Sequence, residues 1–313
     1  MNIAYRFRIY PTEEQKILLG KTFGCCRFLY NQMLNDKIRE YKKTKKLLKN
    51  TSAMYKKEYP FLKEVDSLAL ANVQLHLEKA YKNFFRDPKV GFPRFKSKHH
   101  SKNSYTTNVV NGNILVEDNR IRLPKLKWIS MKKHREPAEN CCLKSVTVSM
   151  EPSGKYFASL LYEGYSCENQ AADKDYSNAK ILGIDYAMQG MAVFSEEIEM
   201  EEAGFFRKNE KRLAREQRKL SRCVKGSRNY VRQKKKVARC HEKIRSQRRD
   251  YLHKLSRRIT DQYDIVAVED IDMKAMSQCL HFGKSIQDNG YGMFRNMLDY
   301  KLAWKGKELV KVD

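Results

Sequence analysis

The sequence predicts an α+β protein with more than one domain. Its 313 residues are enough for about two domains. A helical pattern between about residues 11 and 87 separates an N-terminal strand pattern from a series of short strand-like pieces. The last third places a very basic helical pattern between two apolar strand patterns. Together these observations predict a β-barrel with a helical insertion, followed by a second domain of mixed strands and helices.

The charge of the chain predicts a polyanionic partner. Lys and Arg number 63 against 37 Asp and Glu, which gives a formal net charge of +26. Nucleic acid is the usual partner of so basic a protein. No apolar run reaches the roughly 20 residues of a membrane span, and the N-terminus lacks a signal-peptide pattern. We therefore expect a cytoplasmic, nucleoid-associated prokaryotic protein without a membrane partner.

The eight cysteines predict free thiols rather than a metal centre. They occur singly or as adjacent pairs, and no C-x-x-C motif is present. Zinc sites commonly use that spacing, and adjacent cysteines rarely bridge each other. We expect a reducing compartment and no zinc site in this chain.

The N-terminal half predicts the barrel and its insertion. Residues 3–9 alternate between apolar and basic or polar side chains, as a half-buried strand does. Thr12, followed by Glu13 and Glu14, is a typical helix start. The short strand-like pieces with turn residues between them lie at 105–110, 113–116, 120–123, 143–149 and 156–163. The predicted barrel therefore comprises residues 1–10 and 105–165, and the helical domain comprises residues 11–104.

The C-terminal half begins after a polar linker, residues 166–179. The strand pattern at 180–194 carries Asp185 inside an apolar run. A buried carboxylate is costly unless it is paired or holds a metal, so a strand-end turn or a cation ligand is expected there. Residues 207–258 contain 22 Lys and Arg against 4 Asp and Glu, and predict two antiparallel basic helices. A solvated charged face is the alternative, but such faces normally mix both signs.

A second buried strand at 265–268 ends in Glu269. Strand, basic helical hairpin and strand in this order suggest an RNase H-like domain over residues 180–313. On adjacent strands, Asp185 and Glu269 would share a divalent cation, and oxygen ligands of this kind select Mg²⁺. Two-metal phosphodiester cleavage uses such carboxylates. The alternative is structural, because many strands end in an acidic residue.

Several motifs resemble one known family from end to end. They include AYRFRIYPTEEQ, GCCRFLYNQML, VGFPRFKSK, LGIDYAMQGMAVFS and IVAVEDIDMKAM. In this respect the sequence resembles TnpB, the RNA-guided nuclease of insertion-sequence elements that is related to type V CRISPR effectors. The resemblance implies a wedge β-barrel, an inserted recognition domain and a RuvC domain. It also implies a guide RNA, a double-stranded DNA target with an adjacent motif, and Asp185 and Glu269 as the first two RuvC carboxylates.

In the family, a zinc module and the third catalytic acid follow the strand that ends here at Asp313. We therefore expect an incomplete RuvC domain and an RNA-guided DNA-binding protein that lacks cleavage and acts by target occupancy, as a transcriptional repressor. The alternative is a TnpB endonuclease whose zinc module and third acid are missing from this chain. A third hypothesis is an RNA-binding protein that shields its own transcript.

Three groups of residues are candidates for nucleic-acid contact. The resemblance implies readers of the adjacent motif near Ser67, Leu68, Ala71, Asn108 and Asn111. The GFPRFK motif offers aromatic and basic side chains for stacking and phosphate contact, with a core role for both phenylalanines as the alternative: Phe92, Arg94, Phe95 and Lys96. The helical hairpin offers phosphate contacts through Arg218, Arg222, Lys225, Arg228, Arg232, Lys235 and Arg239.

Overall fold

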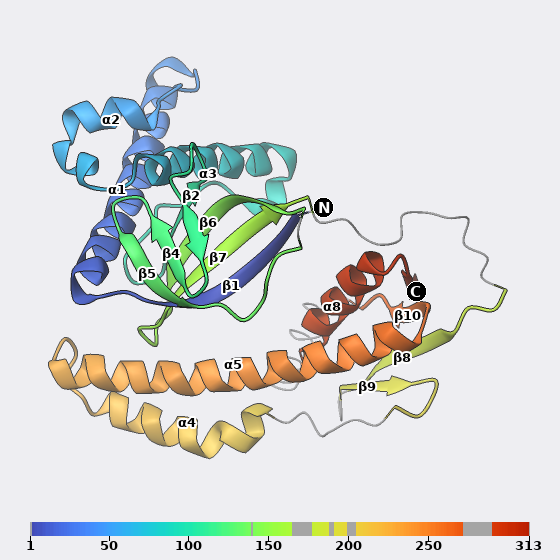
Figure 1. Ribbon diagram of the computed structural model, residues 1–313. Coiled ribbons are helices and arrows are strands. Elements are labelled where there is room, and N and C mark those ends of the chain that lie inside the picture. Colours follow the sequence, from blue (N-terminus) through green and yellow to red (C-terminus); the bar gives the residue numbers. More distant parts are fainter. Residues whose placement is uncertain are drawn as a thin grey trace. The chain divides into compact units, whose positions relative to one another are not determined.

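The computed structural model describes residues 2–138, 140–164, 177–187, 191–198, 205–271 and 290–312. The chain folds into two compact units, Met1–Tyr165 and Ser166–Asp313, called here the N-terminal and C-terminal units (Figure 1). The boundary lies at the start of the expected linker, residues 166–179, of which residues 166–176 lie outside the described residues. No helix in the described part of the chain is long and apolar enough to cross a bilayer.

The N-terminal unit is built on one antiparallel sheet of seven strands. In sequence they are β1 (Asn2–Tyr10), β2 (Asn103–Asn108), β3 (Leu115–Glu117), β4 (Arg120–Leu123), β5 (Lys127–Lys132), β6 (Cys142–Met150) and β7 (Tyr156–Glu163). Their order in the sheet is β2-β6-β7-β1-β5-β4-β3. The first strand of the chain therefore lies in the middle of the sheet, between β7 and β5.

Alternation of side chains decides which face of this sheet is buried. Phe7 and Ile9 of β1 are buried, whereas Arg6 and Arg8 are exposed.

The expected closure into a barrel is not seen in the hydrogen bonding, because β2 and β3 stand at opposite edges of the described sheet. The short strand β3 pairs with β4 alone, so the sheet is open.

Helices of the N-terminal unit fill the interval between β1 and β2. They are α1 (Glu13–Thr44), α2 (Ser52–Glu58), the 3₁₀ helix η1 (Pro60–Glu64), α3 (Ser67–Arg86) and the 3₁₀ helix η2 (Pro88–Val90). Thr12 and Gln15 form a capping box at the start of α1. The Gln15 Nε2 also donates to the carbonyls of Leu126 and Trp128, each at 2.9 Å, which ties α1 to the β4–β5 hairpin and the sheet.

The C-terminal unit contains a four-stranded sheet. Its strands are β8 (Ile181–Ala187), β9 (Met191–Phe194), β10 (Ile265–Glu269) and β11 (Glu308–Val312), in the order β11-β10-β8-β9. Strand β10 is parallel to both β8 and β11, and β9 is antiparallel to β8. One face of this sheet is buried against α5 (Arg228–Gln262) and α8 (Tyr291–Trp304), and Leu182, Val266 and Phe294 lie in the shared core.

The basic segment forms the predicted helical hairpin. Helix α4 (Phe205–Ser221) runs beside the N-terminal part of α5, and a turn with Gly226 at φ +87° joins them (Figure 1). The apolar seam between them is small and includes Leu213, Cys240 and Ile244. The C-terminal part of α5 instead packs on the sheet through Leu252, Leu255 and Ile259.

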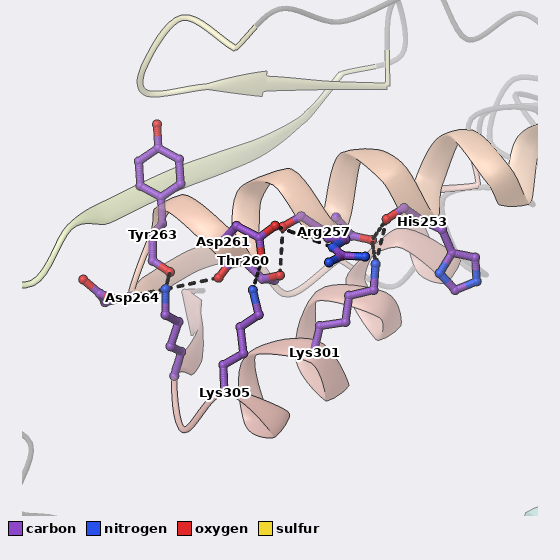
Figure 2. Close-up of polar contacts among 10 residues, drawn as sticks. His253, Arg257, Thr260, Asp261, Tyr263, Asp264, Lys301 and Lys305 are labelled. Carbon is purple, nitrogen blue, oxygen red and sulfur yellow. Dashed lines mark hydrogen bonds and ion pairs between the residues drawn. The ribbon is translucent and has the colours of Figure 1, made fainter. Parts of the chain in front are cut away.

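Lysines from α8 and the segment after it hold the C-terminal end of α5 (Figure 2). Lys307 Nζ donates to the carbonyls of Thr260 and Tyr263, at 3.1 and 2.8 Å. Lys305 pairs with Asp261, and Lys301 Nζ donates to the carbonyl of His253 at 2.7 Å. The last carbonyls of a helix have no partner within the helix, so Lys307 satisfies two acceptors at that end, and the charges of Lys305 and Lys307 offset the negative end of the helix dipole. Lys301 instead attaches α8 to α5 farther back along the helix.

We expect Lys307→Met to destabilise the C-terminal unit by about 2 kcal/mol. The substitution removes two hydrogen bonds from a charged donor to carbonyls at the end of α5, and such bonds contribute about 1.5–3 kcal/mol. Urea unfolding measures the change. Lys225→Met at the exposed hairpin tip is the matched control, and equal stability of the two variants would contradict the assignment.

Acid should weaken the same region. The hydrogen bond from Lys305 lowers the pKa of Asp261, and the backbone N–H of Lys180, followed by Lys307, lowers the pKa of Asp264. A carboxyl whose pKa is lower in the folded state stabilises above its ordinary value, here 3.8, and loses that contribution as the pH falls through the folded pKa. Unfolding midpoints between pH 6 and pH 2.5 should therefore fall less steeply in Asp264→Asn than in the unsubstituted chain, and identical slopes would refute this expectation.

Candidate active site and nucleic-acid surfaces

Asp185 and Glu269 lie side by side on adjacent parallel strands. Ile184 of β8 is paired with Val268 of β10, so the next residue on each strand is one of the two carboxylates. The side chains hydrogen-bond to each other, and this contact, with some burial and the negative charge of Asp185, raises the pKa of Glu269. The sequence therefore identified two residues that the fold brings together across 84 positions.

The reason for the carboxylate in the apolar run differs from the expected one. Asp185 is exposed, whereas its neighbours Ile184 and Tyr186 are buried on the opposite face. Alternation along β8 places Asp185 on the face turned away from α5 and α8. The carboxylate is therefore not buried, and no burial cost has to be offset by a partner.

The two carboxylates lie in a hollow of about 500 Å³ on this face. The other residues that line it are apolar or small: Gly183, Ile184, Val193, Phe194, Ser195, Ala267, Val268 and Val312. Gly183 and Ser195 exchange two hydrogen bonds, from Ser195 N to the Gly183 carbonyl and from Gly183 N to Ser195 Oγ. The described lining contains two acids and no basic side chain, so it attracts cations.

The carboxylate pair fits a divalent cation. Two adjacent carboxylates repel each other when both are ionised, and a cation between them would offset that repulsion. Both are oxygen ligands of the kind that Mg²⁺ prefers. Within the described residues no group of three or more His, Cys, Asp or Glu side chains gathers at one place, so the described site offers two protein ligands.

Sequence reasoning missed the ion pair beside Glu269. Arg295 Nη1 of α8 lies 2.8 Å from Asp270 Oδ1, and Lys311 Nζ of β11 lies 3.5 Å from Asp270 Oδ2. These contacts join the end of β10 to α8 and β11. No spacing in the sequence relates Arg295 to Asp270, because the two residues are 25 positions apart and belong to different elements.

The candidates for reading the adjacent motif lie in the N-terminal unit. Ser67 is the exposed first residue of α3, and Leu68 and Ala71 are half-buried on the same helix. Asn108 ends β2, and its carbonyl accepts a hydrogen bond from Asn113. Asn111 is exposed in the loop after β2 with φ +48°. Their role as readers of the adjacent motif stays a prediction.

Three of the four GFPRFK candidates have exposed side chains, and the fourth, Lys96, contacts an aromatic ring. Phe92, Arg94 and Phe95 are exposed, which argues against the core alternative for the two phenylalanines. Lys96 is half-buried, and its Nζ lies 3.9 Å from the centroid of the Tyr30 ring. Burial lowers its pKa. Lys96 thus makes a contact inside the N-terminal unit and is a weaker phosphate candidate than Arg94.

All seven hairpin candidates are exposed. Arg218 lies on α4, Arg222 and Lys225 lie at the turn, and the rest lie on α5: Arg228, Arg232, Lys235 and Arg239. The acid Glu216 of the same hairpin is held by Gln233, whose Nε2 donates to Glu216 Oε2 at 2.8 Å, and this hydrogen bond lowers the pKa of Glu216. The hairpin therefore presents a strongly positive surface.

Comparison with known proteins identifies sequence relatives over nearly the whole chain. A protein of Streptomyces pristinaespiralis named "Putative RNA-guided DNA endonuclease" is 33% identical over 99% of this chain and 77% of its own length. The Escherichia coli K12 protein "Putative RNA-guided DNA endonuclease InsQ" is 30% identical over 99% of this chain and 80% of its own length.

Two family models also match. The model OrfB_IS605, described as "Probable transposase", matches residues 164–280, and one described as "Helix-turn-helix domain" matches residues 1–46. In the structure, residues 2–44 form strand β1 and the single long helix α1 rather than two helices.

A solved structure shares the fold. The structure entitled "Cryo-EM structure of the Cas12f1-sgRNA-target DNA complex" aligns with a TM-score of 0.55 at 13% identity, over 100% of this chain and 89% of that chain. At this identity the likeness concerns the fold alone. It supports the mixed arrangement of sheets and helices described above.

Proposed function

Because this chain belongs to the TnpB family, we propose that it is an RNA-guided DNA-binding protein that cleaves its target with the help of Mg²⁺ at Asp185 and Glu269. The observation that carries the proposal is the direct side-by-side placement of these two carboxylates in an open hollow. The strand order β11-β10-β8-β9 with a parallel centre supports an RNase H-like domain of RuvC type.

The net charge of the chain and the names of its sequence relatives support nucleic-acid partners. A net charge of +26 and the exposed basic hairpin favour nucleic acid, and relatives over 99% of the chain are named RNA-guided DNA endonucleases. We propose a guide RNA and a double-stranded DNA target with an adjacent motif. In such systems base pairing selects the sequence, while the protein holds the backbone and shape of the nucleic acids.

At the carboxylate pair, Asp185 and Glu269 would hold the cation, which when bound supplies charge stabilisation and an activated water. The role of the chain's own residues is to hold the cation and to orient the DNA strand beside it. The parallel pairing of β8 with β10 fixes the separation of the carboxylates, and the apolar floor around Gly183 and Ala267 leaves space for a DNA strand.

The alternative is a protein that binds guide RNA and target DNA in the same way but does not cleave the DNA. The names of the relatives favour the endonuclease over a protein that only occupies its target. Target occupancy without cleavage stays a prediction, and one experiment separates the two.

The experiment uses the whole chain co-expressed with its flanking element and purified with its bound RNA. The complex is incubated with a plasmid that matches the guide, and with a scrambled plasmid, in Mg²⁺ and in EDTA. Guide-dependent binding with Mg²⁺-dependent cutting supports the proposal. Guide-dependent binding without cutting supports occupancy, and binding that ignores the guide overturns RNA guidance and favours an RNA-binding protein.

The basic hairpin gives a further expectation. Replacing Arg232, Lys235 and Arg239 together with glutamine should weaken DNA binding to a similar degree for all sequences. If each cation contacts one phosphate, the slope of log affinity against log salt should fall by about 2–3, because each phosphate contact contributes about 0.9. Binding titrations between 50 and 300 mM KCl measure the slope. Lys254→Gln, whose lysine is paired with Asp250, is the control, and an unchanged slope in the triple variant would remove the hairpin from the interface.

A further inference from the structure

The end of α3 carries a cluster of aromatic rings that includes Phe92 of the GFPRFK motif. We call Phe84, Phe85 and Phe92, with Tyr81 beneath them, the phenylalanine platform. The ring centroid of Phe92 lies 5.5 Å from that of Phe84 and 5.6 Å from that of Tyr81, both edge to face. The rings of Phe84 and Phe85 are 5.4 Å apart. The cluster joins the last turns of α3 to the loop after η2.

The platform is supported from below and open above. Tyr81 is 9% exposed and Phe84 is half-buried, whereas Phe85 is 64% exposed and Phe92 is 46% exposed. The stacked contact between the rings of Phe85 and Tyr81, at 6.2 Å, holds Phe85 in place. Exposed apolar surface is unfavourable in water, and a contiguous patch usually marks an interaction site.

The surroundings of the platform are basic. Lys82 and Arg86 flank Phe85 on α3, and Lys89 and Arg94 lie on either side of Phe92 in sequence. All four are exposed, and none forms an ion pair or a side-chain hydrogen bond within the described part of the chain. A flat apolar surface surrounded by unpaired cations matches a ligand with flat rings and a negative backbone.

We propose that the phenylalanine platform binds unpaired bases of the guide RNA by stacking, with Lys82, Arg86, Lys89 and Arg94 on the backbone phosphates. The proposal rests on the proposed function, which supplies a guide RNA as a partner. The proposal commits to the guide RNA because the proposed function supplies it as a single-stranded partner, and the flat rings with cations around them match its unpaired bases and its phosphates. Duplex nucleic acid is not expected there, since its bases are already stacked and paired.

The test compares Phe85→Ala with Phe85→Tyr in the full-length chain. Phe85 is exposed, so both variants should fold, and Phe85→Tyr keeps an aromatic ring. The probe is a fluorescein-labelled RNA of 20 nucleotides and mixed sequence, used as a single strand and as a duplex with its complement. Leu75→Ala, at a 52% exposed residue of the same helix, is the matched control.

Stacking on one aromatic side chain predicts a loss of about 5- to 150-fold in single-strand affinity for Phe85→Ala. Phe85→Tyr and Leu75→Ala should stay within about twofold of the unsubstituted chain, and duplex affinity should not change. The salt dependence should persist in Phe85→Ala and decrease in Lys82→Gln combined with Arg86→Gln, because stacking releases no counterions.

Unchanged single-strand affinity in Phe85→Ala would overturn the proposal. So would an equal loss in Leu75→Ala, or an effect of Phe85→Ala on self-association by light scattering without an effect on RNA. These results are distinct from failure of the proposed function, which would appear in the unsubstituted complex as binding that ignores the guide. If the unsubstituted complex cuts matched DNA and Phe85→Ala binds RNA with full affinity, the stacking proposal is refuted while the proposed function stands.

Discussion

Replacing Asp185 with asparagine is expected to lower the rate of guide-dependent DNA cleavage by about 10³-fold or more, while target binding stays within about twofold. The amide keeps the size of the side chain and removes one of the two carboxylates that the described site offers to Mg²⁺. Loss of cation-mediated stabilisation costs several kcal/mol in the transition state, and about 4 kcal/mol corresponds to three decades of rate. Time courses of plasmid cutting under saturating complex give the rate.

The two carboxylates should behave as one unit. Glu269→Gln should cost about as much as Asp185→Asn, and the double variant should cost little more than either, because groups that act together are not additive. Glu197→Gln, at an exposed acid of the same unit, is the control and should cut normally. Full cutting by Asp185→Asn would show that the reaction takes place elsewhere.

Replacing Phe294 with alanine should destabilise the C-terminal unit by about 3–5 kcal/mol. The side chain is 0% exposed and lies in the core between α8 and the sheet, so the substitution removes a large buried ring and leaves a cavity. A loss of this size approaches the whole stability of many domains. Because this core supports β8 and β10, the variant should also lose the geometry of the carboxylate pair.

Urea unfolding monitored by circular dichroism measures this loss. Met293→Ala, at the preceding and 39% exposed residue of α8, is the matched control and should change the free energy of unfolding by less than about 1 kcal/mol. Similar values for the two variants would mean that α8 does not pack through Phe294 as described.

Local pattern was enough to predict the elements that carry the function. Apolar runs located β8 and β10, and the charge bias located the hairpin of α4 and α5. The carboxylates Asp185 and Glu269 were found because each belongs to one of these strands. What the pattern could not give was the face on which Asp185 lies, because a run that is apolar on both sides of a residue hides the alternation that exposes it.

Features that depend on tertiary contacts were beyond reach. The pair of Arg295 with Asp270 and the lysines at the end of α5 join elements that are distant in sequence. Lys96 was predicted as a phosphate contact from the GFPRFK motif, and the motif gave no sign that its ammonium lies over Tyr30. The phosphate contact itself stays a prediction. Phe85 was overlooked because a phenylalanine near a helix end gives no sign in sequence of whether the core covers it.

The 35 residues of α5 form a helix about 52 Å long that packs against the sheet at one end and against α4 at the other. One end is packed on the sheet through Leu252 and Ile259, and the other carries α4 through Cys240 and Ile244. Each residue gained or lost within α5 would turn the hairpin by about 100° around the helix axis relative to the sheet. Evolution is therefore constrained to change the length of α5 by about seven residues, two full turns, at a time. Insertions or deletions in the turn around Gly226 do not rotate the hairpin relative to the sheet, so length variation among relatives should accumulate there.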